Sequence, residues 1–102
     1  MRYYIYLLQI FGGGNPKIHE IIRAYGSAKA VYERVSSGDM TLIPSNRVIN
    51  AKRASLETSD RIINFCKNNN ISIITIDDKT YPVRLKNIYN PPTVLFVEGN
   101  LP

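Results

Sequence analysis

The sequence predicts an α+β protein that is mainly α, in which a bundle of short helices is followed by a strand–helix–strand segment. Through about residue 68, apolar side chains recur at the i, i+3, i+4, i+7 spacing of amphipathic helices, and Gly and Pro separate the repeats. From Ile71 onward the period changes, and β-branched residues take over. We therefore expect a boundary near residues 68–70, with a helical unit at 1–68 and a β-containing unit at 69–102.

Residues 3–8 form a continuous run of aromatic and aliphatic side chains. Such a run fits a strand or a buried helix, and periodicity alone does not decide between them. The glycines at 12–14 end this element. Asn15 then offers a side-chain cap for the next helix, and Pro16 suits its first turn, where no N–H is needed.

Two short helices are expected next, each with one apolar face. The first ends at Gly26, and Ser27 caps the second, which ends at residues 37–38. Because neither helix can bury its face alone, both must pack against the rest of a bundle. The two faces consist of Ile18, Ile21, Ile22 and Tyr25, and of Ala28, Val31, Tyr32 and Val35.

A further helical pattern begins at residues 44–45, and a longer helix is predicted over 55–68. The three asparagines at 68–70 end it, because Asn competes for backbone hydrogen bonds and tolerates left-handed geometry. The side chains expected to face the core are Val48, Ile49 and Ala51 in the first, and Leu56, Ile62, Ile63, Phe65 and Cys66 in the second.

Residues 71–76 are β-branched at nearly every position, which indicates a strand covered on both faces, as in a parallel sheet. A turn at 77–78, a short helix at 82–89 and a second strand at 93–97 follow. This order is that of a βαβ unit. The side chains expected to point inward are Leu85 and Ile88 from the helix, and Leu95 and Phe96 from the strand.

The net charge is +5, and all of the excess lies in residues 1–54, which hold eight Lys/Arg and three Asp/Glu; residues 55–102 hold five of each. Such asymmetry fits a polyanion partner, although a solvated basic surface explains it equally well. Cys66 is the single cysteine, so no internal disulfide can form, and a reducing cytoplasm is expected. No apolar run approaches the roughly 20 residues of a membrane span.

The loop at residues 12–17 is the first candidate binding site. Backbone N–H groups of such a loop, together with the following helix N-terminus, can contact a phosphate. The alternative is a tight interhelical turn that needs glycine for backbone reasons only. The nucleic-acid hypothesis assigns contacts to Gly12, Gly14, Lys17, Lys29 and Arg47.

No set of residues indicates catalysis. His19 has no partner cysteine or histidine, and residues 77–78 are typical of a turn rather than of paired catalytic carboxylates. The glycines lack the Lys-Ser/Thr that completes a phosphate loop. We expect no enzymatic activity, no cofactor and no metal.

The segment from Tyr81 to Leu101 closely resembles the YPxxLxxIxxPPxVLFxxGN signature of the DprA/Smf family, the DNA-processing A proteins of bacterial recombination and natural transformation. Residues 25–30 resemble the family's Phe-Gly-Ser-x-x-Ala segment, with Tyr25 in place of phenylalanine. Residues 73–82 resemble its strand and turn before Tyr-Pro. The signature positions, each of which also has an architectural explanation, are Tyr81, Pro82, Leu85, Ile88, Pro91, Pro92, Leu95, Phe96 and Gly99.

The resemblance implies a helix at residues 3–8. It also implies a helical domain at 1–68 of the sterile-alpha-motif (SAM) or helix-hairpin-helix type, and the first β-α-β segment of a truncated, incomplete Rossmann-like domain at 69–102. In the family the interhelical loop is usually Gly-x-Gly-Pro. Here a third glycine and Asn15 precede Pro16, which departs from that pattern.

For a full-length protein, the resemblance implies binding of single-stranded DNA and loading of the recombinase RecA, in DNA uptake, competence and recombination. The family's Gly-Ser-Arg motif and basic pocket follow the signature, so none of their residues is carried over. We expect an accessory role for this fragment, with weak or no DNA binding and no membrane association. A protein-interaction or packing module without DNA affinity is the alternative, and weak self-association through the C-terminal strands is left open.

Overall fold

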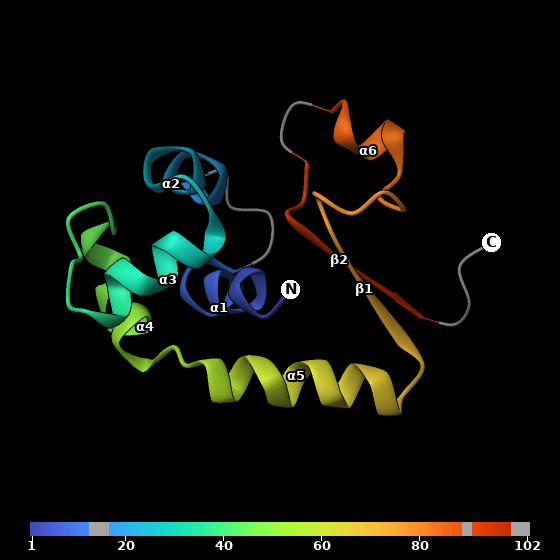
Figure 1. The fold of residues 1–102 in the computed structure, drawn as a ribbon, viewed down its shortest axis with the longest axis horizontal. Helices are drawn as coiled ribbons and strands as arrows, with labels where there is room; N and C mark the ends of the chain where they lie inside the picture. Colours follow the sequence, from blue (N-terminus) through green and yellow to red (C-terminus); the bar gives the residue numbers. More distant parts are fainter. Residues whose placement is uncertain (13–16, 89–90, 99–102) are drawn as a thin grey trace.

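The computed structural model describes residues 1–12, 17–88 and 91–98 (Figure 1). It is mainly helical with a small two-stranded sheet, which confirms the α+β prediction. The elements are α1 (Arg2–Phe11), α2 (Lys17–Tyr25), α3 (Ala28–Ser36), the 3-10 turn η1 (Ser45–Arg47), α4 (Val48–Arg53), α5 (Leu56–Asn68), β1 (Ile71–Thr75), α6 (Val83–Lys86) and β2 (Val94–Glu98).

Helix α1 is the centre of the helical part. It packs against α2, α3, α4 and α5, so its apolar residues are covered from several sides (Figure 1). Leu7 and Ile10 have no exposed surface. The continuous apolar run is therefore a buried helix, as the family resemblance implies. Its core partners are Ile18, Ile21, Ala28, Val31, Val35, Ile43 and Ala51.

The helix ends follow from the residues expected there. Ser27 Oγ accepts from the Ala30 N–H at 3.1 Å, which caps α3. Gly26, between α2 and α3, has φ +105°, a conformation that a residue with a Cβ rarely adopts. At the end of α5, the Asn69 side chain donates to the Phe65 carbonyl at 2.8 Å, and Asn70 is left-handed at φ +56°.

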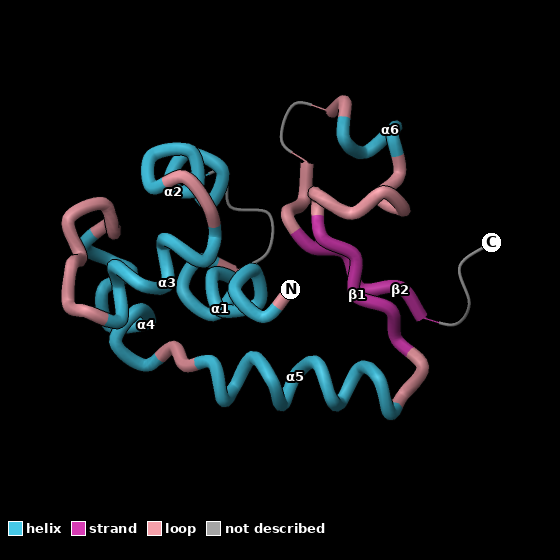
Figure 2. The backbone as a smooth tube through the Cα atoms, viewed as in Figure 1, coloured by secondary structure: helices cyan, strands magenta, loops and turns pink. Residues whose placement is uncertain are grey.

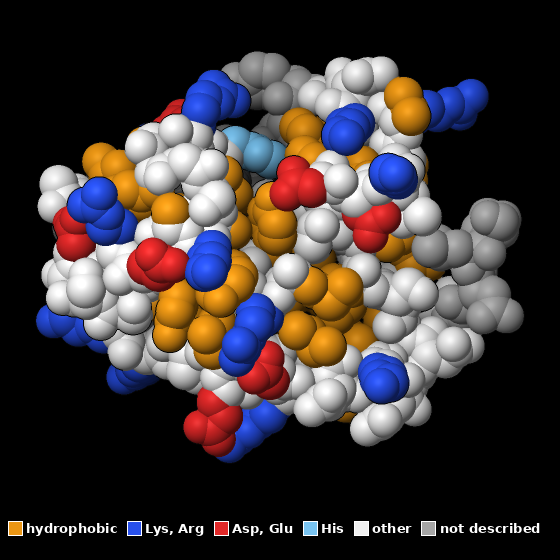
Figure 3. Space-filling view, in the orientation of Figure 1, with side chains coloured by type: hydrophobic (Ala, Val, Ile, Leu, Met, Phe, Trp, Pro, Cys, Tyr) orange, Lys and Arg blue, Asp and Glu red, His pale blue; other side chains and the backbone are white. Residues whose placement is uncertain are grey.

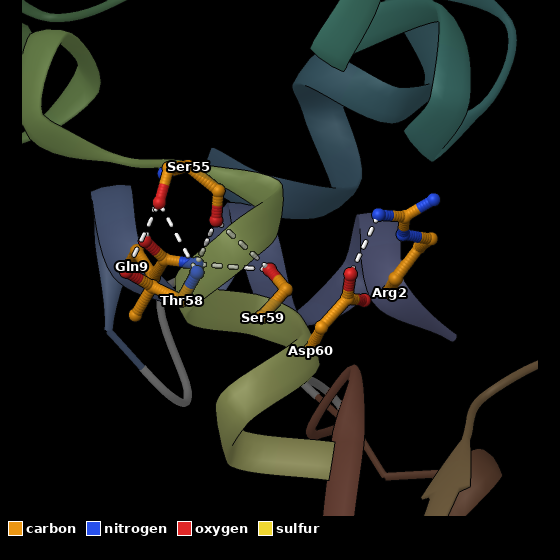
Figure 4. Close-up of polar contacts among 6 residues, drawn as sticks. All are labelled: Arg2, Gln9, Ser55, Thr58, Ser59 and Asp60. Atoms are coloured by element: carbon orange, nitrogen blue, oxygen red, sulfur yellow. Dashed lines mark hydrogen bonds and ion pairs between the residues drawn. The ribbon is translucent and has the colours of Figure 1, made fainter. Parts of the chain in front are cut away.

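A polar clamp joins α1 to the start of α5 (Figure 4). Gln9 Nε2 donates to the Ser55 carbonyl and to Ser59 Oγ, both at 2.9 Å, and Gln9 Oε1 accepts from the Ser55 N–H at 3.1 Å. Ser55 Oγ also caps α5 by accepting from the Thr58 N–H at 3.1 Å. Ser59 has no exposed surface, and its hydroxyl is satisfied by this clamp.

The two strands pair antiparallel, not as the parallel start of a βαβ unit, so that expectation is wrong (Figure 2). Ile71 lies opposite Glu98, and Thr75 lies opposite Val94. A hydrogen bond joins two residues of the connection between the strands: the Tyr81 hydroxyl donates to the Pro92 carbonyl at 2.6 Å. Because α6 is a single short turn, it is no crossover helix, and the chain returns alongside β1 in the reverse direction.

Several side chains expected in the core are exposed. The sheet has only two strands and α4 and α6 are short, so these elements offer too little surface to cover both faces of their neighbours. In β1 only Ile74 is fully buried. The exposed fractions are 65% for Ile49, 61% for Phe65, 48% for Ile88 and 49% for Phe96. By contrast, Ala51 and Cys66 are buried as expected.

Within the described ranges 1–12, 17–88 and 91–98, no helix has the length and apolar character that a membrane span requires.

Candidate nucleic-acid interface

The glycine loop is only partly described. Gly12 ends α1 with φ +74°, and its N–H donates to the Leu8 carbonyl at 2.8 Å. Gly14 lies outside the described residues. Lys17 begins α2, and its ammonium forms an ion pair with Glu20 at 3.3 Å. The charge at this end of α2 is therefore partly compensated.

The structure does not bring the predicted cations into one site. Lys17 borders a hollow of about 540 Å³ between α2 and residues 41–44. Lys29 borders a different hollow at the start of α3, and Arg47 ends η1. On the face shown in Figure 3, Lys and Arg side chains alternate with Asp and Glu rather than forming one patch.

A seam between the helices and the turn after β1 collects residues that are far apart in the chain. We define it by Tyr3, Tyr4, His19, Ile22, Arg23, Gly26, Lys29 and Asp77. The Tyr4 hydroxyl donates to the Asp77 carboxylate. His19 Nε2 lies 2.8 Å from the Pro91 carbonyl, and because a carbonyl only accepts, this nitrogen carries the proton. Both bonds hold the helices against the strand segments.

The seam contains two hollows, of about 280 and 380 Å³. Tyr4, Ile22, Gly26 and Asp77 line both of them, so the Tyr4–Asp77 contact lies between the two. The first hollow is also lined by Tyr3 and Lys29, and the second by His19 and Arg23. Each hollow thus pairs one cation with an aromatic ring.

The seam keeps the Tyr4 hydroxyl protonated at neutral pH. Burial, and then the hydrogen bond to Asp77, raise the pKa of Tyr4 well above its ordinary value. The Tyr4 hydroxyl is therefore a stable donor to the carboxylate. Arg23 and Lys29 are exposed, and neither forms an ion pair with another described residue.

The signature positions lie mainly in the strand–turn–strand part. Tyr81 is buried and tied to Pro92, while Pro82 precedes α6 as its cap. Pro91 accepts from His19 across the seam. Leu85 and Leu95 are half-buried, Ile88 and Phe96 are exposed, and Gly99 lies outside the described residues.

Comparison with known families agrees with the C-terminal resemblance. Residues 72–102 match the family model of DNA recombination-mediator protein A. This stretch contains the signature from Tyr81 to Leu101, and it covers under a third of the chain. No curated protein and no solved structure matches the chain. The family match points to a role in DNA recombination or processing.

Sequence reasoning missed the seam. The sequence predicts a solitary histidine at His19 and a turn residue at Asp77, and no local spacing connects either of them to residues 3–4. Only the packing of α1 and α2 against the strand segments brings them together. Among the described residues, no group of three or more His, Cys, Asp and Glu side chains could hold a metal ion.

Proposed function

We propose that this chain is the N-terminal part of a DprA-like DNA-processing protein, which binds single-stranded DNA and loads RecA in recombination and natural transformation in the cytoplasm. The family match of residues 72–102 carries the proposal. In it, residues 1–68 form an accessory SAM or helix-hairpin-helix-like domain. Residues 69–102 contribute the first strands of a Rossmann-like domain.

The charges of the chain limit how tightly it binds DNA by itself. Among the described residues, four Lys and Arg side chains are ion-paired with nearby carboxylates: Arg2 with Asp60, Lys17 with Glu20, Arg34 with Asp39, and Arg61 with Glu57. The remaining cations are spread over several elements. Binding therefore rests on a few phosphate contacts, and counterion release makes it weaker as salt rises.

A titration of a labelled single-stranded oligonucleotide tests this function. Fluorescence anisotropy should show binding at about 20 mM salt that falls steeply by about 150 mM, as expected for contacts to a few phosphates. The same titration on a duplex of equal length is the control. No binding to the single strand at low salt would contradict the DNA-binding part of the proposal.

A protein-interaction or packing module without DNA affinity is the second candidate. The exposed apolar side chains Ile49, Phe65, Val83 and Phe96 favour it. A two-stranded sheet also leaves open strand edges, which can pair with another copy of the chain. Sedimentation velocity over a range of protein concentrations separates the candidates: a rising mass without DNA binding supports the module.

A further inference from the structure

The cations of the seam differ from the ion-paired cations of the chain in what they face. The ion-paired Arg and Lys side chains point to carboxylates on their own or neighbouring elements. Arg23 and Lys29 instead border the two hollows, without an ion pair to a described residue. Unpaired cations beside a hollow are available to neutralise an anion that enters it.

The seam also offers aromatic surface that is held in place. The rings of Tyr3 and Tyr4 are half-buried and line the first hollow. The Tyr3 ring packs on Tyr32 with centroids 5.5 Å apart, and the Tyr4 hydroxyl is bonded to Asp77. Ordered tyrosines beside cations provide the two elements of single-strand binding, namely a stacking surface for bases and charge for the backbone.

The dimensions favour an unpaired strand. Hollows of about 280 and 380 Å³ lie just below and near the lower end of the range of small-ligand sites, a size that suits one nucleotide unit rather than a larger group. In a duplex the bases are stacked and paired, and they cannot turn into such a hollow without unpairing. The two hollows meet at Tyr4 and Asp77, which allows consecutive nucleotides to occupy them.

Asp77 gives the seam a carboxylate that has two opposite effects. Its charge repels phosphate and lowers affinity, because Asp77 lines both hollows together with their cations. Its oxygens can also accept from the N–H groups of a base, while Tyr4 holds the side chain in position. Replacement by Asn keeps an accepting oxygen and removes the charge, so it should strengthen binding, which is the reverse of the effect expected for a cation.

We propose that the seam binds a short stretch of single-stranded DNA, with backbone phosphates on Arg23 and Lys29 and a base against the Tyr3 ring. The proposal rests on the proposed DNA-processing function and assigns its contact in this chain to the seam. The hollow beside Lys17 is the competing location, since Lys17, one of the contacts predicted with the glycine loop, lines it.

Anisotropy titrations of an oligonucleotide of about ten nucleotides at low salt test the location. Arg23→Ala and Lys29→Ala should each weaken binding severalfold and reduce the slope of log K against log salt by about one. Lys67→Ala, an exposed cation at the end of α5, is the matched control and should change affinity little. Lys17→Ala tests the competing hollow.

A charge-removal pair completes the design. Asp77→Asn should tighten binding severalfold, whereas Asp39→Asn, which removes a half-buried carboxylate on another part of the surface, should not. Apart from the half-buried Asp39, these variants change exposed side chains, and circular dichroism checks that each one is folded.

The outcomes separate the two proposals. Binding that is weakened by the Arg23 and Lys29 variants and tightened by Asp77→Asn supports the seam. Binding that responds to Lys17→Ala alone, or equally to every lysine variant, overturns the seam and leaves the DNA-binding function intact. Failure of the unmodified chain to bind at low salt contradicts the DNA-binding function itself.

Discussion

The clamp of Gln9 on Ser55 and Ser59 should be the strongest polar contribution to the packing of α1 on α5. Gln9→Met keeps the length of the side chain but removes its three hydrogen bonds. At about 1 kcal/mol net for each bond, the loss is about 3 kcal/mol. Burial of the thioether offsets part of it, which leaves a destabilisation of about 2 kcal/mol.

A change of this size should be visible by two methods. For a chain of this length it lowers the melting temperature by about 10 °C. Urea unfolding followed by circular dichroism should show a lower midpoint with an unchanged slope, because the surface exposed on unfolding is the same.

The control breaks an exposed contact between the same two helices. Arg2 and Asp60 form an ion pair at 2.8 Å, with side chains 43% and 48% exposed. Because water screens such a pair, Arg2→Ala should cost about 0.5 kcal/mol. A Gln9→Met protein no less stable than the Arg2→Ala protein would refute the reasoning that the clamp joins α1 to α5.

Three further predictions concern the strand–turn–strand part and its contact with the helices. Tyr81→Phe removes the bond to the Pro92 carbonyl and should destabilise the protein by about 1 kcal/mol in urea unfolding; an unchanged midpoint would contradict a stabilising role of this bond. The folded protein raises the pKa of Tyr4, so the contribution of the protonated Tyr4 hydroxyl to folding stability is complete below about pH 10 and is lost as the pH rises further. The stability of the Tyr4→Phe protein should therefore fall less steeply from about pH 9 to 11 than that of the unmodified protein. Amides of residues 71–75 should exchange with solvent faster than those of residues 21–25 in a dilute sample; if they are instead the most protected amides, the sheet is more stable than two strands imply.

The boundaries of the helices and strands were predictable because they depend on residues only a few positions apart. Ser27 and Ser55 are caps that satisfy backbone donors within three residues, and the Asn run at 68–70 ends α5 by the same short-range effects. The change from helical to β-branched spacing at Ile71 likewise acts over a few residues. Each of these signals involves only neighbouring residues of the sequence, and each of these boundaries is confirmed.

The direction of the strands and the burial of single side chains depend on contacts between distant residues. An apolar pattern indicates which side chains favour burial, but it does not indicate whether another element of the fold is present to cover them. Phe65 and Phe96 have the expected spacing and are exposed, because no described element packs over them. The antiparallel return of β2 follows from a connection whose helix, α6, is a single turn and too short for a crossover, and the strand residues themselves do not specify this direction.

The sequence by itself determined the helices from α2 onward, the two strands, the helix caps and the family signature in the C-terminal third, because these depend on neighbouring residues. Tertiary structure alone decided that Tyr4 meets Asp77, 73 positions along the chain, and that His19 meets Pro91 across the same seam. The physical reason is that both contacts follow from how α1 and α2 pack against the strand segments. Packing depends on all of the surfaces in contact at once, and no stretch of sequence contains them together.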